Sequence, residues 1–374
     1  MLHITQNQKS IFRILKGGKV SLVVSGLILG GSPTLSHAEI SGINGLYDIN
    51  GINDAIAIDD DANTSVAITL DGTISTSSDD TGLSISDVSP RSLDINISNA
   101  STIEVVHNGL EAYGIKKEAS DNDMLNISIV NEGNISIFGE PGSAKGIAIN
   151  TDFNFNADDI NITNSGTITI GNKDTVANPN YAHGITIHSG GIISNLQLSN
   201  SGTIETNSDS GWSSGIASWR YQSNPNSHGN QIHNSSITNS DTIYTHSSGT
   251  SGISSGLYFA SYFSNSFIEN KQTGNINTIS EASYASDIFV WGLENSTIMN
   301  EGNLSANGIN FVAGIYSYKN ITNSLIHNTG TISVDVNSSM TDYGSYAIFT
   351  HNGDGTLFIE NNGTILSTVD KNLN

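Results

Sequence analysis

The sequence has no cysteine, only five prolines, and 13 basic residues against 35 acidic ones in a chain of 374 residues. The absence of cysteine excludes a disulfide framework, although a chain of this length can bury a core without one. The shortage of basic residues disfavours nucleic acid and anionic membrane surfaces as partners, because a net charge of −22 repels phosphate groups. Uncharged Asn, Ser, Thr and Gly supply most of the polarity, since only 13% of the residues are charged.

Basic residues are concentrated near the start of the sequence. Four of them, and no acidic residue, stand before an apolar run at 20–29: Lys9, Arg13, Lys16 and Lys19. Ser36 and Ala38 then provide small residues at positions −3 and −1 of a cleavage site. This arrangement predicts a secretory signal peptide over residues 1–38, since a membrane anchor would need about 20 apolar residues. We therefore expect export through the inner membrane, which leaves nine basic residues against 35 acidic ones and a net charge near −26.

One motif recurs along the rest of the chain: an apolar residue, any residue, Asn, then a short Gly- or Thr-containing stretch that ends in Ile or Leu. Its asparagines are separated by 28 to 39 residues and are Asn99, Asn131, Asn164, Asn200, Asn239, Asn270, Asn300, Asn328 and Asn361. A weaker first copy has Leu70 at the asparagine position. Such regular spacing predicts a repeat architecture with a unit of roughly 33 residues.

Each repeat contains three short segments in which apolar and polar residues alternate, for example 125–129, 135–137 and 146–149. Alternation with a period of two is typical of half-buried strands. Because one rung of three strands cannot bury its apolar side chains alone, it must stack on its neighbours. The sequence therefore predicts an all-β fold, a right-handed single-stranded parallel β-helix (a solenoid) of about ten three-strand rungs.

The expected boundaries are a cap region over 39–65, the β-helix over 66–368 and a tail over 369–374. We expect the asparagine before each glycine to adopt the left-handed backbone of a tight turn. We also expect these asparagine side chains to hydrogen-bond to one another along the stack.

The basic signal region, the Asn-x-Gly-Thr-Ile rungs, the acidity and the lack of cysteine together resemble the passenger domains of autotransporters (type V secretion) of Gram-negative bacteria. The resemblance covers roughly residues 1–368 and implies a location at the cell surface or outer membrane, or secretion, with an adhesive or aggregating function. Autotransporters end in an outer-membrane β-barrel, whereas this sequence ends in Lys371-Asn-Leu-Asn374. We therefore expect a fragment, the product of a truncated gene, or a protein exported by a separate partner, so that the translocator barrel acts in cis or in trans.

A polysaccharide-active enzyme of the pectate lyase or polygalacturonase type is the enzymatic alternative, because such enzymes share the β-helix. Asn150-Thr151-Asp152 and Asp158-Asp159 superficially resemble their carboxylate motifs, and catalysis would need such carboxylates together on adjacent rungs. The Gly-His-Gly and Arg-x-Lys companions are absent, as is the Gly-Asp-Ser-Gly motif of serine-protease autotransporters. We therefore predict a protein without catalytic residues.

Three groups of residues are candidate metal ligands. The pairs His183 and His188, and His228 and His233, lack a carboxylate or cysteine that would complete a zinc site. The run Asp59-Asp60-Asp61 lacks the spaced pattern of a calcium loop. We predict no metal and no cofactor.

Twelve of the 26 aromatic residues, including all three tryptophans, lie between residues 212 and 291. They either pack on the solenoid or form an exposed contact surface, since aromatic side chains bury large areas in interfaces. The candidate adhesive residues are Trp212, Trp219, Tyr221, Tyr258 and Trp291. The predicted function is that of an adhesin or structural rod that contacts glycans or proteins of a host or neighbouring cell; a passive spacer or degenerate passenger is the other alternative.

Overall fold

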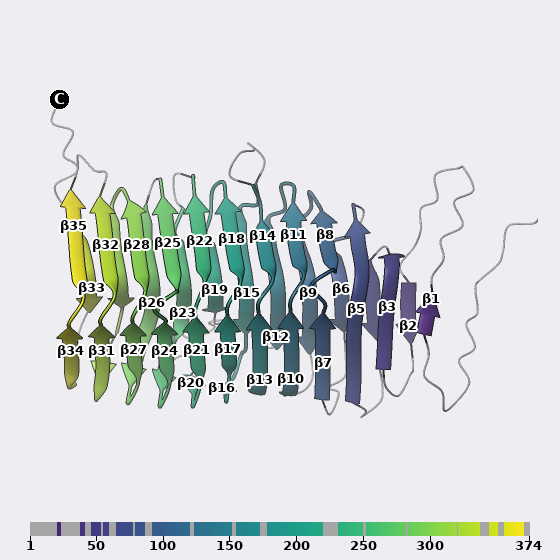
Figure 1. Cartoon of the computed structure of the whole chain (residues 1–374), viewed down its shortest axis with the longest axis horizontal. Coiled ribbons are helices and arrows are strands. Elements are labelled where there is room, and N and C mark those ends of the chain that lie inside the picture. Colours follow the sequence, from purple (N-terminus) through teal and green to yellow (C-terminus); the bar gives the residue numbers. More distant parts are fainter. Residues whose placement is uncertain are drawn as a thin grey trace, which may run out of the picture.

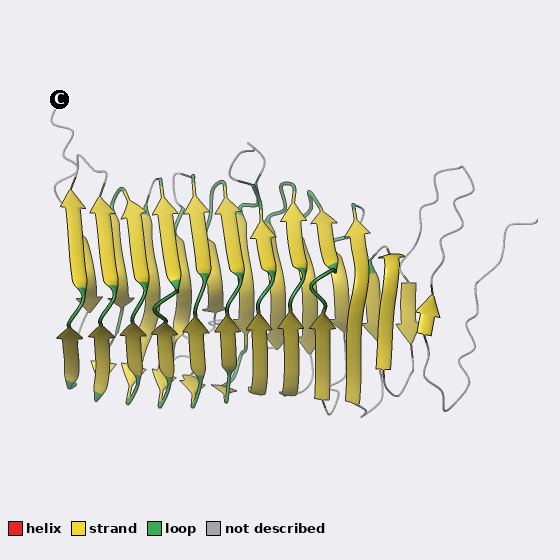
Figure 2. Cartoon of the chain, in the orientation of Figure 1, coloured by secondary structure: helices red, strands yellow, loops and turns green. Residues whose placement is uncertain are grey.

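The computed structural model describes residues 21–23, 38–41, 46–53, 55–59, 65–77, 79–86, 92–119, 123–151, 155–172, 178–219, 231–249, 252–281, 283–319, 321–336, 344–350 and 355–369. These residues contain strands and no helix, and their strands pair in parallel (Figures 1 and 2). The chain is a parallel β-solenoid of about eight turns, so the predicted all-β parallel β-helix is confirmed. The right-handed sense and the count of ten rungs stay predictions.

Each complete rung between residues 92 and 350 contributes one strand to each of three sheets (Figure 1). The first sheet consists of β7 (Ser92–Ile97), β10 (Met124–Asn131), β13 (Ala157–Asn164), β17 (Gln197–Asn200), β21 (Ser236–Asn239), β24 (Phe267–Asn270), β27 (Thr297–Asn300), β31 (Ser324–Asn328) and β34 (Leu357–Asn361). The second consists of β8 (Thr102–Val106), β11 (Asn134–Phe138), β14 (Thr167–Ile170), β18 (Thr203–Ser208), β22 (Thr242–Ser247), β25 (Asn275–Ser280), β28 (Asn303–Gly308), β32 (Thr331–Val336) and β35 (Thr364–Val369). The third consists of β6 (Thr81–Ser86), β9 (Glu111–Ala119), β12 (Ser143–Thr151), β15 (Tyr181–His188), β19 (Ser213–Trp219), β23 (Ser254–Ser264), β26 (Tyr284–Glu294), β29 (Phe311–Ser317) and β33 (Ser345–Thr350).

The remaining strands lie at the start of the solenoid and at one of its corners. The long β5 (Ser65–Thr76) pairs with both β7 and β8, so it serves the first two sheets at once. Before it, the parallel stack continues through β1 (Ser21–Val23), β2 (Ala38–Ser41), β3 (Leu46–Asn53) and β4 (Ile56–Asp59). Three short strands extend the pairing at a corner: β16 (Ile193–Ser194), β20 (Gln231–His233) and β30 (Ile321–Thr322).

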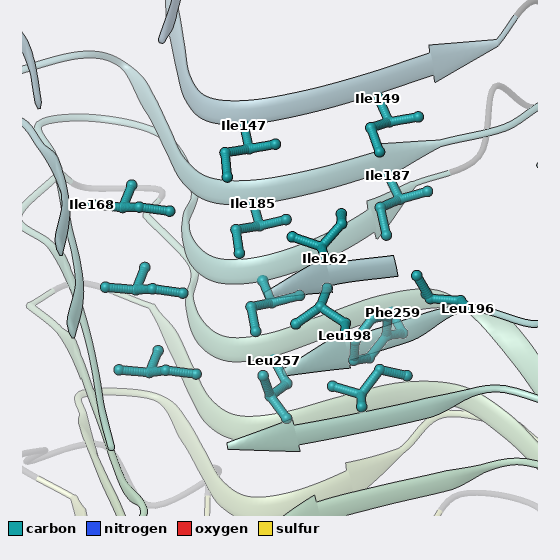
Figure 3. Close-up of a cluster of buried hydrophobic side chains, with 14 of the residues drawn as sticks. Ile147, Ile149, Ile162, Ile168, Ile185, Ile187, Leu196, Leu198, Leu257 and Phe259 are labelled. Atoms are coloured by element: carbon teal, nitrogen blue, oxygen red, sulfur yellow. The ribbon is translucent and has the colours of Figure 1, made fainter. Parts of the chain in front are cut away.

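Alternation of apolar and polar residues determines which side chains enter the core. In β14, Ile168 and Ile170 are buried and the intervening Thr169 is half-buried on the outer side. Parallel pairing places Ile168 beside Ile135 and Ile204 of the adjoining rungs. The same alignment repeats in all three sheets and produces one continuous apolar core, part of which is shown in Figure 3. The stack thus provides the burial that a single rung lacks.

The asparagines of the motif form a hydrogen-bonded ladder at the end of the first sheet. The Nδ2 of each one donates to the Oδ1 of its counterpart in the next rung, over 2.6–2.9 Å, through Asn131, Asn164, Asn200, Asn239, Asn270, Asn300, Asn328 and Asn361. Nδ2 also donates within its own rung, for example from Asn200 to the carbonyl of Gly202 at 2.9 Å. The expected hydrogen bonding along the stack is therefore confirmed.

The expectation of a left-handed backbone at these asparagines is wrong. Positive φ angles of 46–54° occur instead at a second column of residues, five positions earlier in each rung: Asn126, Asp159, Asn195, Asn234, Asn265, Asn295 and Asn323. The glycine of the motif is required for close approach, because a Cβ on Gly166 would lie 2.0 Å from the carbonyl oxygen of Gly133. Glycine has no Cβ and therefore allows this close approach in most rungs, while Asp241 takes the corresponding position in one rung.

In one rung the motif assigns the ladder position to the wrong residue. Pairing places Ile97, and not Asn99, beside Asn131, while Leu70 lies beside Ile97. Asn99 sits exposed in a turn that is two residues longer than most of the others, so it does not join the ladder. Consequently Asn131 Oδ1, at the first position of the ladder, is buried without a hydrogen-bond partner.

Candidate functional site

The outer surface of the third sheet carries an unusual column of side chains. Parallel pairing aligns Ala217, Tyr258, Phe289, Tyr316 and Phe349 in β19, β23, β26, β29 and β33. Alternation makes these positions face outward, because the residues next to them in sequence enter the core. With their neighbours they form what we call the aromatic strip: Trp212, Trp219, Tyr258, Tyr284, Phe289, Trp291, Phe311, Tyr316, Tyr318, Tyr346 and Phe349.

Tyr258 and Phe289 form the floor of the strip. Their rings are stacked, with centroids 4.7 Å apart and an interplanar angle of 10°. Each ring covers a face of the other, and the two residues are only 9% and 8% exposed. Burial raises the pKa of Tyr258 to about 12, so its hydroxyl stays protonated at neutral pH.

Two tryptophans border this floor at the β19 end. Trp212 and Trp219 meet edge to face at 5.9 Å, and each also contacts Tyr258, at 5.3 and 6.2 Å. Behind Trp219 lies His183, whose ring centroid is 4.1 Å from that of the indole. His183 is fully buried and neither ring nitrogen has a hydrogen-bond partner. Burial, together with the positive charge of Lys145, holds its pKa well below the usual value.

The strip continues on the other side of the floor. Trp291 lies 4.6 Å from Tyr318, and Lys319 Nζ lies 4.9 Å from the Tyr318 centroid and 5.8 Å from that of Trp291. Phe289 contacts Tyr316 at 5.2 Å, which joins the floor to this group. Burial and the neighbouring tyrosines raise the pKa of Tyr316 to about 12.

The last part of the strip is the most open. Phe311 contacts four rings at 4.9–5.8 Å: Tyr284, Tyr316, Tyr346 and Phe349. Tyr284 and Tyr346 are 42% and 38% exposed, in contrast to the covered floor. The strip therefore offers accessible ring surface over several successive rungs.

At the opposite end, the outer surface of the third sheet becomes polar. The Tyr113 hydroxyl donates to Glu111 at 2.6 Å, and Lys145 pairs with the same carboxylate at 3.5 Å. Lys116 pairs with Glu118 at 2.8 Å. The hydrogen bond from Tyr113 and the nearby lysines lower the pKa of Glu111 although partial burial opposes them. Charges in this part are thus balanced locally.

Four of the five predicted adhesive residues belong to the strip. Trp212, Trp219 and Trp291 are partly exposed and Tyr258 is buried; Tyr221 lies outside the described residues. The density of aromatic residues along the chain does not point to the strip residues beyond 291, such as Tyr316 and Phe349. Their spacing could have identified them, because aromatic residues recur about one repeat apart at Tyr258, Phe289, Tyr316 and Phe349.

Among the residues considered for catalysis and metal binding, His183 packs against Trp219 of the strip, whereas Asp158 lies in β13 of the first sheet. Asp158 accepts hydrogen bonds from Ser194 Oγ at 2.6 Å and from Asn195 Nδ2 at 3.0 Å, beside the first sheet. Asp152, His228 and Asp60 lie outside the described residues. Within the described part of the chain, no group of three or more His, Asp or Glu side chains could hold a metal ion, and no helix is long and apolar enough to cross a membrane.

Comparisons with protein-family models, with curated proteins and with solved structures find no match to this chain. The arrangement of its own residues is therefore the basis for a functional proposal.

Proposed function

We propose that this chain is an exported, surface-exposed rod of the autotransporter-passenger type, and that it acts as an adhesin through the aromatic strip. The observation that carries the proposal is the alignment of aromatic rings in register on the outer side of one sheet. Contiguous exposed apolar surface is uncommon on monomeric soluble proteins and marks contact sites.

The second sheet provides a comparison within the same molecule. Its corresponding outward column is mostly polar and consists of Glu104, Ser136, Thr169, Glu205, Tyr244, Asn277, Ser305 and Ser333. The solenoid fold therefore does not itself require aromatic residues on its outer surface. Their accumulation on the third sheet supports a role in contact with another molecule.

A rod of stacked rungs suits adhesion for a physical reason. Many weak contacts along one surface add through effective concentration and need no single tight pocket. In the proposal, the signal peptide over residues 1–38 directs export, and an outer-membrane translocator barrel acts in cis or in trans. The ligands are glycans or proteins of a host or neighbouring cell.

Display on a non-adherent bacterium tests the function. The chain after residue 38 is fused to a borrowed translocator barrel, and binding to host cells and cell–cell aggregation are measured. Trp219→Ala should reduce binding, whereas Tyr244→Ala, an aromatic change on the second sheet, should not. Absence of binding and aggregation with surface-displayed, folded protein would favour the passive spacer instead.

A further inference from the structure

We infer that the ligand of the aromatic strip is a linear, uncharged glycan that lies along the rungs. This inference rests on the proposed function and names the chemistry of its ligand. It follows from three properties of the strip: the type of its rings, its charge and its length.

The rings are of the kind that recognises sugars. All three tryptophans of the chain lie on the strip, together with five tyrosines, so flat apolar faces alternate with N–H and O–H groups at their tips. The C–H face of a pyranose ring carries slight positive charge and packs on the negative face of an aromatic ring. Its hydroxyls lie around the edge, where exposed tyrosine hydroxyls such as those of Tyr284 and Tyr346 can reach them, whereas Trp219 offers its ring face because its Nε1 is buried.

The charge of the strip favours an uncharged ligand. Among the described acidic residues of the third sheet, Glu111 and Glu118 are paired with lysines, Asp287 is buried, and Glu294 is exposed at the end of β26. Lys319 is engaged over Trp291 and Tyr318. An anionic glycan would therefore find little counter-charge here and would be repelled by a chain of net charge −22. A basic protein would be drawn to the acidic remainder of the surface.

The length of the strip favours a chain over a single sugar. It extends from β19 to β33 through successive parallel strands. Neighbouring strands are about 4.8 Å apart, so the strip is on the order of 19 Å long, enough for several sugar residues. Because Tyr258 and Phe289 cover each other, the ligand would contact the less buried rings, among them Trp219 and Trp291.

Intrinsic tryptophan fluorescence tests the inference, because every tryptophan of the chain reports from the strip. The full chain is titrated with cellohexaose, chitohexaose, xylohexaose and mannohexaose, and with hexagalacturonate as the anionic control. We expect at least one neutral hexasaccharide to change the emission. The monosaccharide should bind about tenfold or more weakly, and affinity should be nearly the same between about 50 and 500 mM salt.

Matched variants locate the site. Trp219→Ala and Trp291→Ala should each weaken binding about tenfold, as loss of a stacking tryptophan does, and Tyr244→Ala should leave it unchanged. Response to none of the sugars, or only to hexagalacturonate with loss at high salt, overturns the inference. So does a dimer in sedimentation that Trp219→Ala dissociates, since a second copy would then be the occupant.

The two proposals fail in different ways. If the sugars do not bind but displayed cells still adhere in a Trp219-dependent manner to a surface stripped of glycans, adhesion stands and the glycan ligand is wrong. If the sugars bind in solution but displayed cells adhere to nothing, the glycan ligand stands and adhesion is wrong.

Discussion

Asp287 and Leu304 replace, in register, a glycine and an isoleucine that face each other in most other rungs. Pairing aligns Asp287 with Gly256 and Gly314, and Leu304 with Ile276 and Ile332. A Cβ on the glycines of this column would lie 2.1–2.5 Å from the Cγ2 of the facing isoleucine. Leucine has no Cγ2 on its β-carbon, so the rung with Leu304 has room for the Cβ of Asp287.

This relationship predicts a coupling between the two positions. Leu304→Ile in the natural chain should cost about 1–3 kcal/mol, because it restores the crowding methyl beside an aspartate. In an Asp287→Gly background the same change should be nearly neutral. A double-mutant cycle measured by urea unfolding should give a coupling of about 0.5–3 kcal/mol. Additive effects of the two substitutions would contradict the inferred contact.

The buried carboxyl of Asp287 predicts a pH dependence of stability. Thr278 Oγ1 donates to Oδ1 at 2.7 Å, while Oδ2 has no partner, and burial raises the pKa well above its ordinary value. The folded protein thus holds this proton at pH values where the unfolded chain releases it. Stability is therefore lost as pH rises through the unfolded-state value of about 3.9 toward the folded-state value.

Asp287→Asn removes this titration. It should raise the midpoint of thermal unfolding at pH 7, and its advantage should shrink as pH falls toward 4. Melts at pH 4, 5.5 and 7 measure the effect, with the exposed Asp241→Asn as control. A difference that is the same at all three pH values would show that the carboxyl does not titrate as stated.

His183 predicts the opposite dependence. Its pKa is lowered in the folded state, because the ring is buried between Trp219 and the positive charge of Lys145. The unfolded chain takes up a proton below about pH 6.5, so stability is lost as pH falls through that value. His183→Phe should reduce the loss of stability between pH 7.5 and 5.5. Denaturant unfolding at the two pH values, monitored by tryptophan emission, measures this loss. His246→Phe, on the second sheet beside Glu281, should leave the loss in place.

The asparagine ladder predicts a position-specific cost. Asn239 accepts from Asn200 and donates to Asn270 and to the carbonyl of Asp241. Asn239→Ala leaves buried partners unpaired and should destabilise the chain by about 2–4 kcal/mol, at about 1–3 kcal/mol for each unsatisfied group. Asn99→Ala should change stability by less than about 0.5 kcal/mol, because Asn99 is exposed in a turn. Equal losses of stability in the two variants would show that Asn99 belongs to the ladder.

The fold was predictable because alternation and phased motifs report directly on burial and stacking. Ile168 and Thr169 differ in burial as their pattern required. Asn99 was misassigned because its spacing to Ile103 matches the motif, and a two-residue extension of the turn leaves no mark in that pattern. The residues with a left-handed backbone, such as Asn195, were not predictable. The motif does not distinguish an asparagine that is needed for its side-chain hydrogen bonds from one that is needed for its backbone conformation.

Only the part of the aromatic strip between Trp212 and Trp291 could be predicted from the sequence. Density along the chain identified Trp212 to Trp291, but spatial neighbours in a solenoid are one repeat apart, so Tyr316 and Phe349 fell outside the window. The burial of Tyr258 depends on its stacking against Phe289, which only the aligned rungs reveal.

The asparagine ladder allows the length of the rod to change by whole repeats. Each interior rung presents the same donor on one side and the same acceptor on the other. Loss of a whole repeat would bring Asn200 against Asn270 with the bond chemistry unchanged, and gain of one would insert a further identical step. The distance that such a rod spans can therefore evolve in increments of about 4.8 Å, by recombination between repeats, without any new interface having to arise.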